Sequence, residues 1–171
     1  MINGNSENLK QKLGKIKVLL TDMDGVLTNG TVFYTQEGQL LKQFNVKDGL
    51  AVHLLHEAGL KCGIVTSDTS AIGKIRGTRI RFDFVYTEAI NKSLILDEII
   101  SKTGLKEEEF CFIGDDVNDI PILSRVGLSV APADAHSKIL AIVDYVSQKP
   151  GGSGVFREIA DLLIDSGSIN D

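Results

Sequence analysis

The feature that most constrains the fold is a regular alternation between short apolar runs, bounded by turn-forming residues, and longer stretches with helical periodicity. Short apolar runs of this kind are typical of strands buried in a parallel sheet. The pattern predicts strands at residues 17–21, 61–66, 83–86, 110–114, 128–130 and 144–146. It predicts helices at residues 50–58, 70–78, 92–103, 117–124, 135–141 and 155–165. The expected fold class is therefore α/β, a doubly wound, mainly parallel, Rossmann-like sheet with helices on both faces.

One segment departs from this alternation. Two apolar stretches within residues 31–44 flank a turn that contains Gly38, which predicts a β-hairpin. We expect the hairpin to project from the sheet and not to extend it. The length of 171 residues fits one domain, so residues 1–171 are expected to form a single domain with that hairpin. The first dozen residues and the tail 167–171 are expected to be loosely ordered.

The overall charge limits the partners that the surface can attract. The formal net charge is −5 and the isoelectric point is near 5.2, so the surface as a whole repels nucleic acid and anionic lipid. The apolar runs are far shorter than the roughly 20 residues of a membrane-spanning helix, and the polar N-terminus lacks the features of a signal peptide. We therefore expect no nucleic-acid or membrane partner and a cytoplasmic location.

Cys62 and Cys111 lie inside apolar runs and are expected to be buried structural thiols.

Two aspartates follow the first predicted strand, in the run VLLTDMDGVLT of residues 18–28. In an open α/β sheet, ligands bind at the carboxyl ends of the strands. Asp22 and Asp24 stand at such an end, and Gly25 allows the chain to turn immediately after them. Both carboxylates are therefore expected to reach the same crevice.

A second acidic run, FIGDDVND at residues 112–119, repeats this arrangement. Its Asp115, Asp116 and Asp119 follow a predicted strand and open a helix, where Asp116 and Asp119 could alternatively serve as caps. Strand ends that lie side by side would gather several carboxylates, and a divalent cation with oxygen ligands relieves their mutual repulsion. The sequence thus predicts a Mg²⁺ site between the two acidic runs.

Phosphoryl transfer needs two further groups, a hydroxyl that holds the non-bridging oxygens and a cation that neutralises developing charge. Thr66 ends a predicted strand and Lys92 opens a predicted helix, so both kinds of group are available. Each is common at such a position when taken alone. Together with the acidic runs they point to a phosphoryl-transfer enzyme.

The set DxDGVLT, strand-terminal Thr, Lys at a helix start and GDDxND, in this order, resembles the haloacid dehalogenase superfamily of phosphotransferases over nearly the whole chain. The hairpin, the run FNVKDG at 44–49 and the run KPGGSGVFRE at 149–158 narrow the resemblance to small phosphatases of octulosonate and nonulosonate synthesis. That family has no cap domain. The resemblance implies a Mg²⁺-dependent phosphomonoesterase that forms an aspartyl-phosphate, with 3-deoxy-D-manno-octulosonate 8-phosphate as the expected substrate.

The resemblance also implies how the two acidic runs would act. The carboxylate of Asp22 would attack phosphorus. Asp24 would protonate the leaving sugar oxygen and later activate water. The Asp22 carboxylate, the Asp24 backbone carbonyl and Asp115 would hold Mg²⁺.

The remaining residues are assigned by the same resemblance. Thr66 and Lys92 would bind the phosphoryl oxygens, and Asp116 would orient Lys92. The substrate itself would be contacted by Thr28, Asn45, Val46, Lys47, Asp48, Gly49, His53, Ser67, Asp68, Arg76, Lys92, Asp119 and Arg157.

The chain departs from the family after its second main-sheet strand. Members that act on the octulosonate usually carry Thr-Gly-Arg there, whereas this chain has Thr66-Ser67-Asp68. Losing a guanidinium removes a bidentate partner for the sugar carboxylate. The acidic residue resembles instead the branch acting on 2-keto-3-deoxynononate 9-phosphate, and Arg79 could pair with Asp68 or with the substrate. N-acylneuraminate 9-phosphate is a further alternative substrate.

The resemblance implies a homotetramer, because family members join through their hairpins. The hairpin of this chain, with Phe33, Tyr34 and Leu41, is too apolar for an isolated solvent-exposed element.

Two other functional classes stay open, a phosphoryl-accepting signalling domain and a non-catalytic domain associated with a sugar-acid cytidylyltransferase. An acid/base at Asp24 argues against the first because it speeds dephosphorylation, and the intact aspartates argue against the second.

Overall fold

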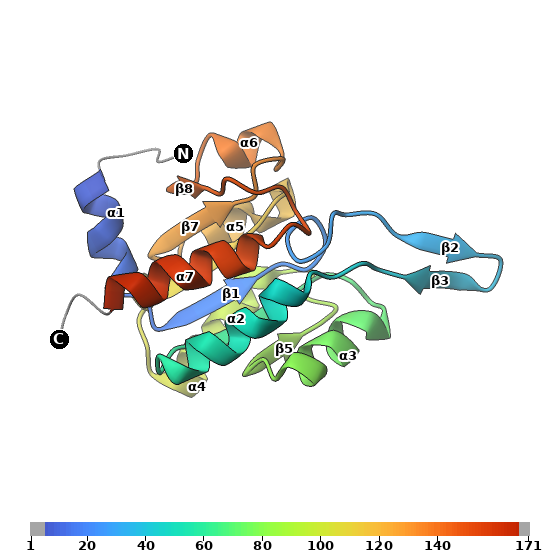
Figure 1. The fold of residues 1–171 in the computed structure, drawn as a ribbon, viewed down its shortest axis with the longest axis horizontal. Helices are drawn as coiled ribbons and strands as arrows, with labels where there is room; N and C mark the ends of the chain where they lie inside the picture. The colour runs from blue at the N-terminus through green and yellow to red at the C-terminus, as the bar shows by residue number, and fades with distance from the viewer. Residues whose placement is uncertain (1–5, 168–171) are drawn as a thin grey trace.

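The computed structural model describes residues 6–167, except the side chains of Ser6, Gln39 and Leu40. Its main sheet has six parallel strands in the order β5-β4-β1-β6-β7-β8 (Figure 1). The strands are β1 (Val18–Thr21), β4 (Lys61–Val65), β5 (Phe84–Tyr86), β6 (Phe110–Ile113), β7 (Leu128–Ala131) and β8 (Tyr145–Val146). The chain moves to one side of β1 and later to the other, so the doubly wound fold predicted from the sequence is confirmed.

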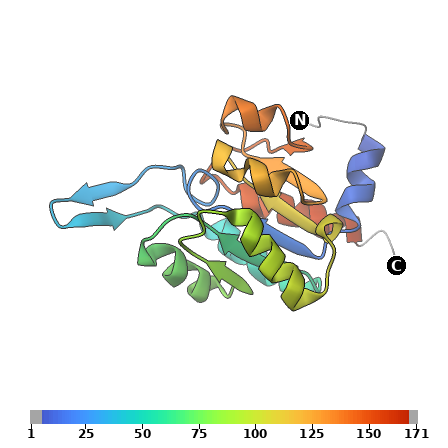
Figure 2. The same cartoon turned by 180° about the vertical axis from the view of Figure 1, so that it is seen from behind.

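Helices cover both faces of this sheet, and each face has its own apolar core (Figures 1 and 2). Side chains of β1 alternate between the two cores, with Leu19 in one and Val18 and Leu20 in the other. The first core also receives α2 (Val46–Glu57), α3 (Ala71–Ile80) and α7 (Val155–Gly167), and the second receives α4 (Lys92–Thr103), α5 (Ile120–Leu123) and α6 (Ser137–Leu140). Two short 3₁₀ turns, η1 (Glu107–Glu109) and η2 (Val117–Asp119), precede β6 and α5.

Two helices differ by more than two residues from their predicted bounds. The helix predicted at 50–58 begins at Val46, because the Asn45 side chain accepts the N–H of Lys47 and caps a first turn that carries no apolar periodicity. The helix predicted at 117–124 is divided into η2 and α5. Pro121 lies in the first turn of α5, where its missing N–H costs least.

The N-terminal segment is more ordered than expected from its sequence. Residues Ser6–Leu13 form helix α1, which Leu13 anchors to the first core with 7% exposure. The ammonium of Lys12 also lies 2.6 Å from the carboxylate of Asp144. The prediction of loose order is therefore wrong for 6–12 and for Gly167, which ends α7, while 1–5 and 168–171 lie outside the described residues.

The predicted hairpin is confirmed as a separate two-stranded antiparallel sheet formed by β2 (Phe33–Thr35) and β3 (Gly38–Leu41). It projects from the body of the molecule, beyond the end of β1 (Figure 1). Three of its apolar side chains are strongly exposed, with Phe33 at 55%, Tyr34 at 69% and Leu41 at 57%. No residue in the described part of this single chain buries these three side chains.

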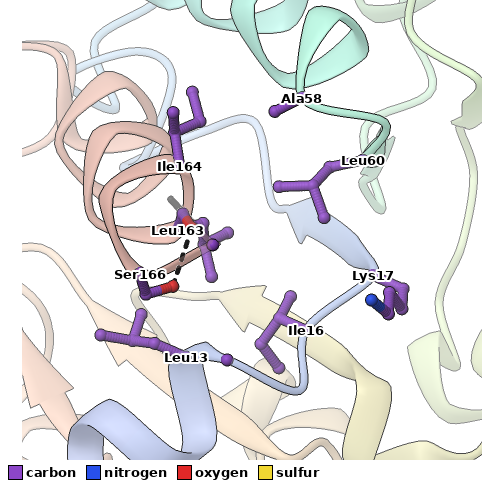
Figure 3. Close-up of a pocket in the computed structure, with 10 residues that line it drawn as sticks. Leu13, Ile16, Lys17, Ala58, Leu60, Leu163, Ile164 and Ser166 are labelled. Carbon is purple, nitrogen blue, oxygen red and sulfur yellow. Dashed lines mark hydrogen bonds between the residues drawn. The ribbon is translucent and has the colours of Figure 1, made fainter. Parts of the chain in front are cut away.

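A pocket of about 280 Å³ lies near the amino ends of β1 and β4, between α1, α7 and the turn that enters β4 (Figure 3). Leu13, Ile16, Leu60 and Leu163 supply apolar walls. Among the described residues that line it, Lys17 has the only charged side chain. This end of the sheet is opposite the carboxyl ends of the strands, where the acidic runs lie.

Two further expectations concern burial and membranes. Cys62 and Cys111 are both buried free thiols, as predicted. None of the helices in the described part of the chain combines the length and apolar composition needed to cross a membrane.

Candidate active site

The carboxyl ends of β1 and β6 bring the two acidic runs together. These strands are neighbours, with Thr21 opposite Ile113, so Asp22 and Asp115 follow adjacent strand ends. One carboxylate oxygen from each of Asp22, Asp115 and Asp119 lies within 4.8 Å of the others. Asp22 is 5% exposed and Asp119 is fully buried. The predicted meeting of the two acidic runs is therefore confirmed.

Two glycines permit this close approach. Gly25 has φ +78°, which L side chains rarely adopt, and a Cβ there would lie 2.0 Å from Oδ2 of Asp115. A Cβ at Gly114 would lie 2.5 Å from Oδ2 of Asp119. Larger residues at these positions would push the carboxylates apart.

Lys92 provides the cation of this cluster from the first turn of α4. Its Nζ lies 2.6 Å from Oδ2 of Asp22 and 2.5 Å from Oδ1 of Asp119, and its side chain is 1% exposed. Burial alone would lower the pKa of Lys92, but the two carboxylates outweigh it and raise that pKa above its ordinary value. Lys92 therefore carries a fixed positive charge beside Asp22.

The prediction that Asp116 orients Lys92 is wrong. Asp116 is exposed, and its Oδ1 accepts the N–H of Val117 at 2.6 Å, which is the capping role held open as an alternative. Asp119, which the sequence had assigned to the substrate, contacts Lys92 and also accepts the N–H of Asp115 at 3.0 Å. The tight 3₁₀ turn η2 brings Asp119 back beneath the strand end.

The cluster has the charge of a divalent cation site. Three carboxylates and one ammonium leave a formal charge of −2. Burial raises the pKa of Asp22 to about 6. The attraction of Lys92 opposes this rise, and repulsion from Asp119 adds to it. Burial and the charges of Asp22 and Asp119 raise the pKa of Asp115 to about 7. Carboxylates that resist ionisation in this way and offer only oxygen ligands fit Mg²⁺.

Asp24 lies beside this cluster with different partners. Its Oδ1 accepts the hydroxyl of Thr28 at 3.2 Å, and its Oδ2 lies 2.5 Å from Nζ of Lys42. Lys42 follows the hairpin strand β3, and sequence reasoning missed it. A charged residue inside the apolar stretch 40–44 was the available sign.

Thr66 and Asp68 follow the end of β4. Thr66 is 2% exposed, and its hydroxyl accepts the N–H of Asp68 at 3.2 Å. The carboxylate of Asp68 accepts the hydroxyl of Ser70 and lies 3.2 Å from Lys42. Burial alone would raise the pKa of Asp68, but these two contacts hold it below its usual value. The cation beside Asp68 is therefore Lys42, and not the exposed Arg79 suggested from the sequence. The neighbouring Ser67 is exposed.

The substrate-side residues of the hairpin exit and α2 lie next to one another but are partly committed to local contacts. Besides capping α2, Asn45 donates from its side-chain nitrogen to the carbonyl of Gly152 at 3.4 Å. Arg76 donates to the carbonyl of Asn45 at 3.1 Å and lies over the ring of Phe44. Gly49 packs beside Arg76. The exposed side chains in this group are those of Val46 and Lys47.

Two other predicted substrate residues pair along their own helices. His53 lies 3.3 Å from Glu57 and its side chain is 67% exposed. The Nε of Arg157 donates to Asp161 at 2.7 Å. Within the described part of the chain both side chains pair with a carboxylate on their own helix and not with Asp22 or Asp24, so their substrate roles stay predictions.

Asp48 links α2 to α7. It is 1% exposed, its Oδ1 accepts the N–H of Arg157 at 3.0 Å, and its Oδ2 has no hydrogen-bond partner among residues 6–167. Burial raises its pKa to about 6, against the opposing effects of that hydrogen bond and of the charges of Arg76 and Lys149. Asp48 is thus first of all a structural residue between two helices.

We expect Asp48→Asn to alter the pH dependence of stability. The folded pKa of about 6 exceeds the ordinary 3.8, so the folded state binds more protons between these values and ionisation of Asp48 lowers the free energy of unfolding as pH rises. This loss is up to about 3 kcal/mol between pH 4 and pH 7. The variant lacks it, so urea titrations should show its stability rising relative to the parent over that range. A difference independent of pH would contradict the prediction.

A second group of potential metal ligands lies at the edge of the sheet, outside this site. His56 lies 2.9 Å from Oδ2 of Asp83, which also accepts the N–H of Cys62 at 2.9 Å. The thiol of Cys62 is buried, and burial raises its pKa far above the ordinary value. These groups satisfy one another and tie α2 to β4.

Comparison with known proteins gives one consistent result. Residues 66–159 match the family described as haloacid dehalogenase-like hydrolase. The 3-deoxy-D-manno-octulosonate 8-phosphate phosphatase of Escherichia coli is 33% identical over 159 residues, covering 93% of this chain and 85% of that protein. The crystal structure of the phosphatase of that name from Yersinia pestis has a TM-score of 0.92 at 31% identity, covering 95% of this chain and 88% of that one.

A further similar structure holds ligands. It is the 3-deoxy-D-manno-octulosonate 8-phosphate phosphatase of Moraxella catarrhalis in complex with magnesium ion, phosphate ion and a KDO molecule. Its TM-score is 0.92 at 27% identity, and the match covers 96% of this chain and 94% of that one. Fold, carboxylate cluster and similarity over most of the chain agree, and the chain belongs to the haloacid dehalogenase-like hydrolases.

Proposed function

We propose that this chain hydrolyses the phosphomonoester of a sugar acid, with 3-deoxy-D-manno-octulosonate 8-phosphate as its substrate. The observation that supports this most is the placement of Asp22 between Lys92 and Asp115 at the carboxyl end of β1. A buried carboxylate beside a fixed cation and a divalent-cation site is what phosphoryl transfer to an aspartate requires. The identity of the substrate is inferred from the names of the similar phosphatases.

In the proposed reaction, an oxygen of Asp22 forms a bond to phosphorus while the bond from phosphorus to the sugar oxygen breaks. Asp24 gives a proton to that leaving oxygen. Water then attacks the phosphorus of the aspartyl-phosphate and loses its proton to Asp24, which restores Asp22 and releases phosphate. Lys92 holds a phosphoryl oxygen and keeps Asp22 in place, and the hydroxyl of Thr66 would bind another oxygen.

The residues present fit the metal that this chemistry needs. The Asp22 and Asp115 carboxylates and the backbone carbonyl of Asp24 would hold Mg²⁺. When bound, Mg²⁺ supplies positive charge that offsets the charge on the phosphoryl oxygens. Asp119 stays with Lys92 in this arrangement.

Phosphate release from a panel of sugar-acid phosphates tests the proposal. We expect the highest kcat/KM with 3-deoxy-D-manno-octulosonate 8-phosphate. A preference for 2-keto-3-deoxynononate 9-phosphate or N-acylneuraminate 9-phosphate would overturn the substrate but keep the reaction. An aspartyl-phosphate that accumulates without release would instead indicate a signalling domain, and no phosphoryl transfer at all would indicate a non-catalytic domain.

Exchanging single carboxylates within the second acidic run tests how Lys92 is held. Asp119→Asn removes the charge that contacts Lys92, so we expect kcat to fall about 10²-fold because the cation loses its orientation. Asp116→Asn is the matched control, since Asp116 is exposed and only caps η2. Its kcat should stay within about threefold of the parent. Equal losses in both variants would contradict this assignment.

We also propose that the chain acts as a homotetramer in the cytoplasm. The isolated two-stranded sheet β2–β3 exposes Phe33, Tyr34 and Leu41, and such a hairpin is marginal unless it packs against other copies. Light scattering should give four times the mass of one chain, and Tyr34→Ser should lower it. A monomer in dilute solution would overturn the assembly.

A further inference from the structure

Lys42 is the one basic residue of the hairpin exit whose side chain is almost completely buried beside Asp24. Its side chain is 1% exposed. Its Nζ lies 2.5 Å from Oδ2 of Asp24 and 3.2 Å from Oδ2 of Asp68. The ammonium therefore connects three separate segments, the hairpin exit, the turn after β1 and the turn after β4.

A buried ammonium is costly unless carboxylates or other acceptors surround it. Asp68 meets this need and is itself held by the hydroxyl of Ser70, while its backbone N–H donates to Thr66. The carboxylate of Asp68 is thus occupied inside the protein. This explains an acidic residue at position 68 without any substrate hydroxyl as its partner.

Asp24 is fixed from both sides by these contacts. Thr28 donates to Oδ1, and Lys42 contacts Oδ2. The side chain of Asp24 is still 37% exposed, so the carboxylate can meet a substrate while its direction is set. Proton transfer by a positioned side chain depends on such control of direction and distance.

We propose that Lys42 is a positioning residue that holds Asp24 in the orientation needed to protonate the leaving oxygen, and that Asp68 serves as the anchor of Lys42. This inference rests on the proposed function, because it assigns a partner to the acid of that reaction. It gives the hairpin a part in the chemistry of its own subunit.

The test compares two phosphomonoesters by kcat/KM, which reports the steps up to departure of the leaving group. An alkyl phosphate, such as 3-deoxy-D-manno-octulosonate 8-phosphate, needs a proton on its leaving oxygen, whereas p-nitrophenyl phosphate releases a stable phenolate. In Lys42→Met we expect kcat/KM to fall about thirtyfold for the alkyl phosphate and less than about threefold for the aryl phosphate. Asp68→Asn should show the same pattern with a smaller loss, and Lys74→Met, which changes an exposed lysine on α3, should show neither loss.

A double-mutant cycle completes the test. In an Asp24→Ala background, Lys42→Met should lower kcat/KM for the alkyl phosphate by less than about twofold, because the group that it positions is gone. Equal losses for both substrates in Lys42→Met, or losses that multiply with Asp24→Ala, would overturn the inference. If the unmodified protein hydrolyses neither substrate, the proposed function fails instead, so the two failures are distinguishable.

Discussion

Asp22→Asn should abolish phosphate release, with kcat at least about 10⁴-fold below that of the unmodified protein. The substitution keeps the shape of the side chain but removes the negative oxygen that attacks phosphorus in the proposed reaction. Lys92 would keep its contact with Asp119, so the variant retains the cation next to the reaction centre. Phosphate release from 3-deoxy-D-manno-octulosonate 8-phosphate, followed over a long incubation, measures the loss.

The same substitution should leave the fold intact. Since burial raises the pKa of Asp22 to about 6, the ionised carboxylate opposes folding at pH 7.5 when no metal is bound. We therefore expect the metal-free variant to be no less stable than its parent, within about 1 kcal/mol. Asp97→Asn, which changes an exposed carboxylate on α4, is the control and should keep full activity. A variant at position 22 that is stable and still turns over at near-normal rate would rule out Asp22 as the nucleophile.

Removal of divalent cations should have the next largest effect. Dialysis against EDTA should lower phosphate release at least about 10³-fold, and added Mg²⁺ should restore it. The reason is the formal charge of −2 in the cluster of Asp22, Asp115, Asp119 and Lys92, which one divalent ion neutralises. Full activity after chelation would contradict the assignment of the cluster.

Thermal unfolding gives an independent measurement of the same site. A ligand that binds only the folded state raises Tm with its concentration. Mg²⁺ should therefore stabilise the EDTA-treated protein, and Asp115→Asn should remove most of that stabilisation because it takes away the negative charge of one ligand. Asp116→Asn should keep it, since its carboxylate only caps η2.

The sequence was sufficient to predict the parallel sheet and the meeting of the two acidic runs at its carboxyl edge. Apolar runs at β1 and β6 could be recognised individually, and neighbouring parallel strands bring Asp22 and Asp115 to one edge. The distinction between Asp116 and Asp119 could not be made in this way. It depends on the path of η2, a turn whose geometry follows from local packing and from Pro121 and not from hydrophobic periodicity.

Two other features depend on contacts that are distant along the chain. Lys42 and Asp24 are separated by the whole hairpin, and no strand pairing in the main sheet relates them. Helix α1 has too little apolar surface to be recognised by itself, yet Leu13 and the ion pair of Lys12 with Asp144 dock it onto the sheet. Tertiary contacts of this kind have no signature within a short window of sequence.

The hairpin β2–β3 leaves the body of the protein as an arm whose returning strand, β3, ends one residue before Lys42. Another subunit or an antibody that bound this arm would act next to Lys42, which contacts Asp24, the proton donor of the proposed reaction. Specific activity should then vary with protein concentration as subunits associate and separate. The rate of ester cleavage would in this way depend on the assembly of the subunits.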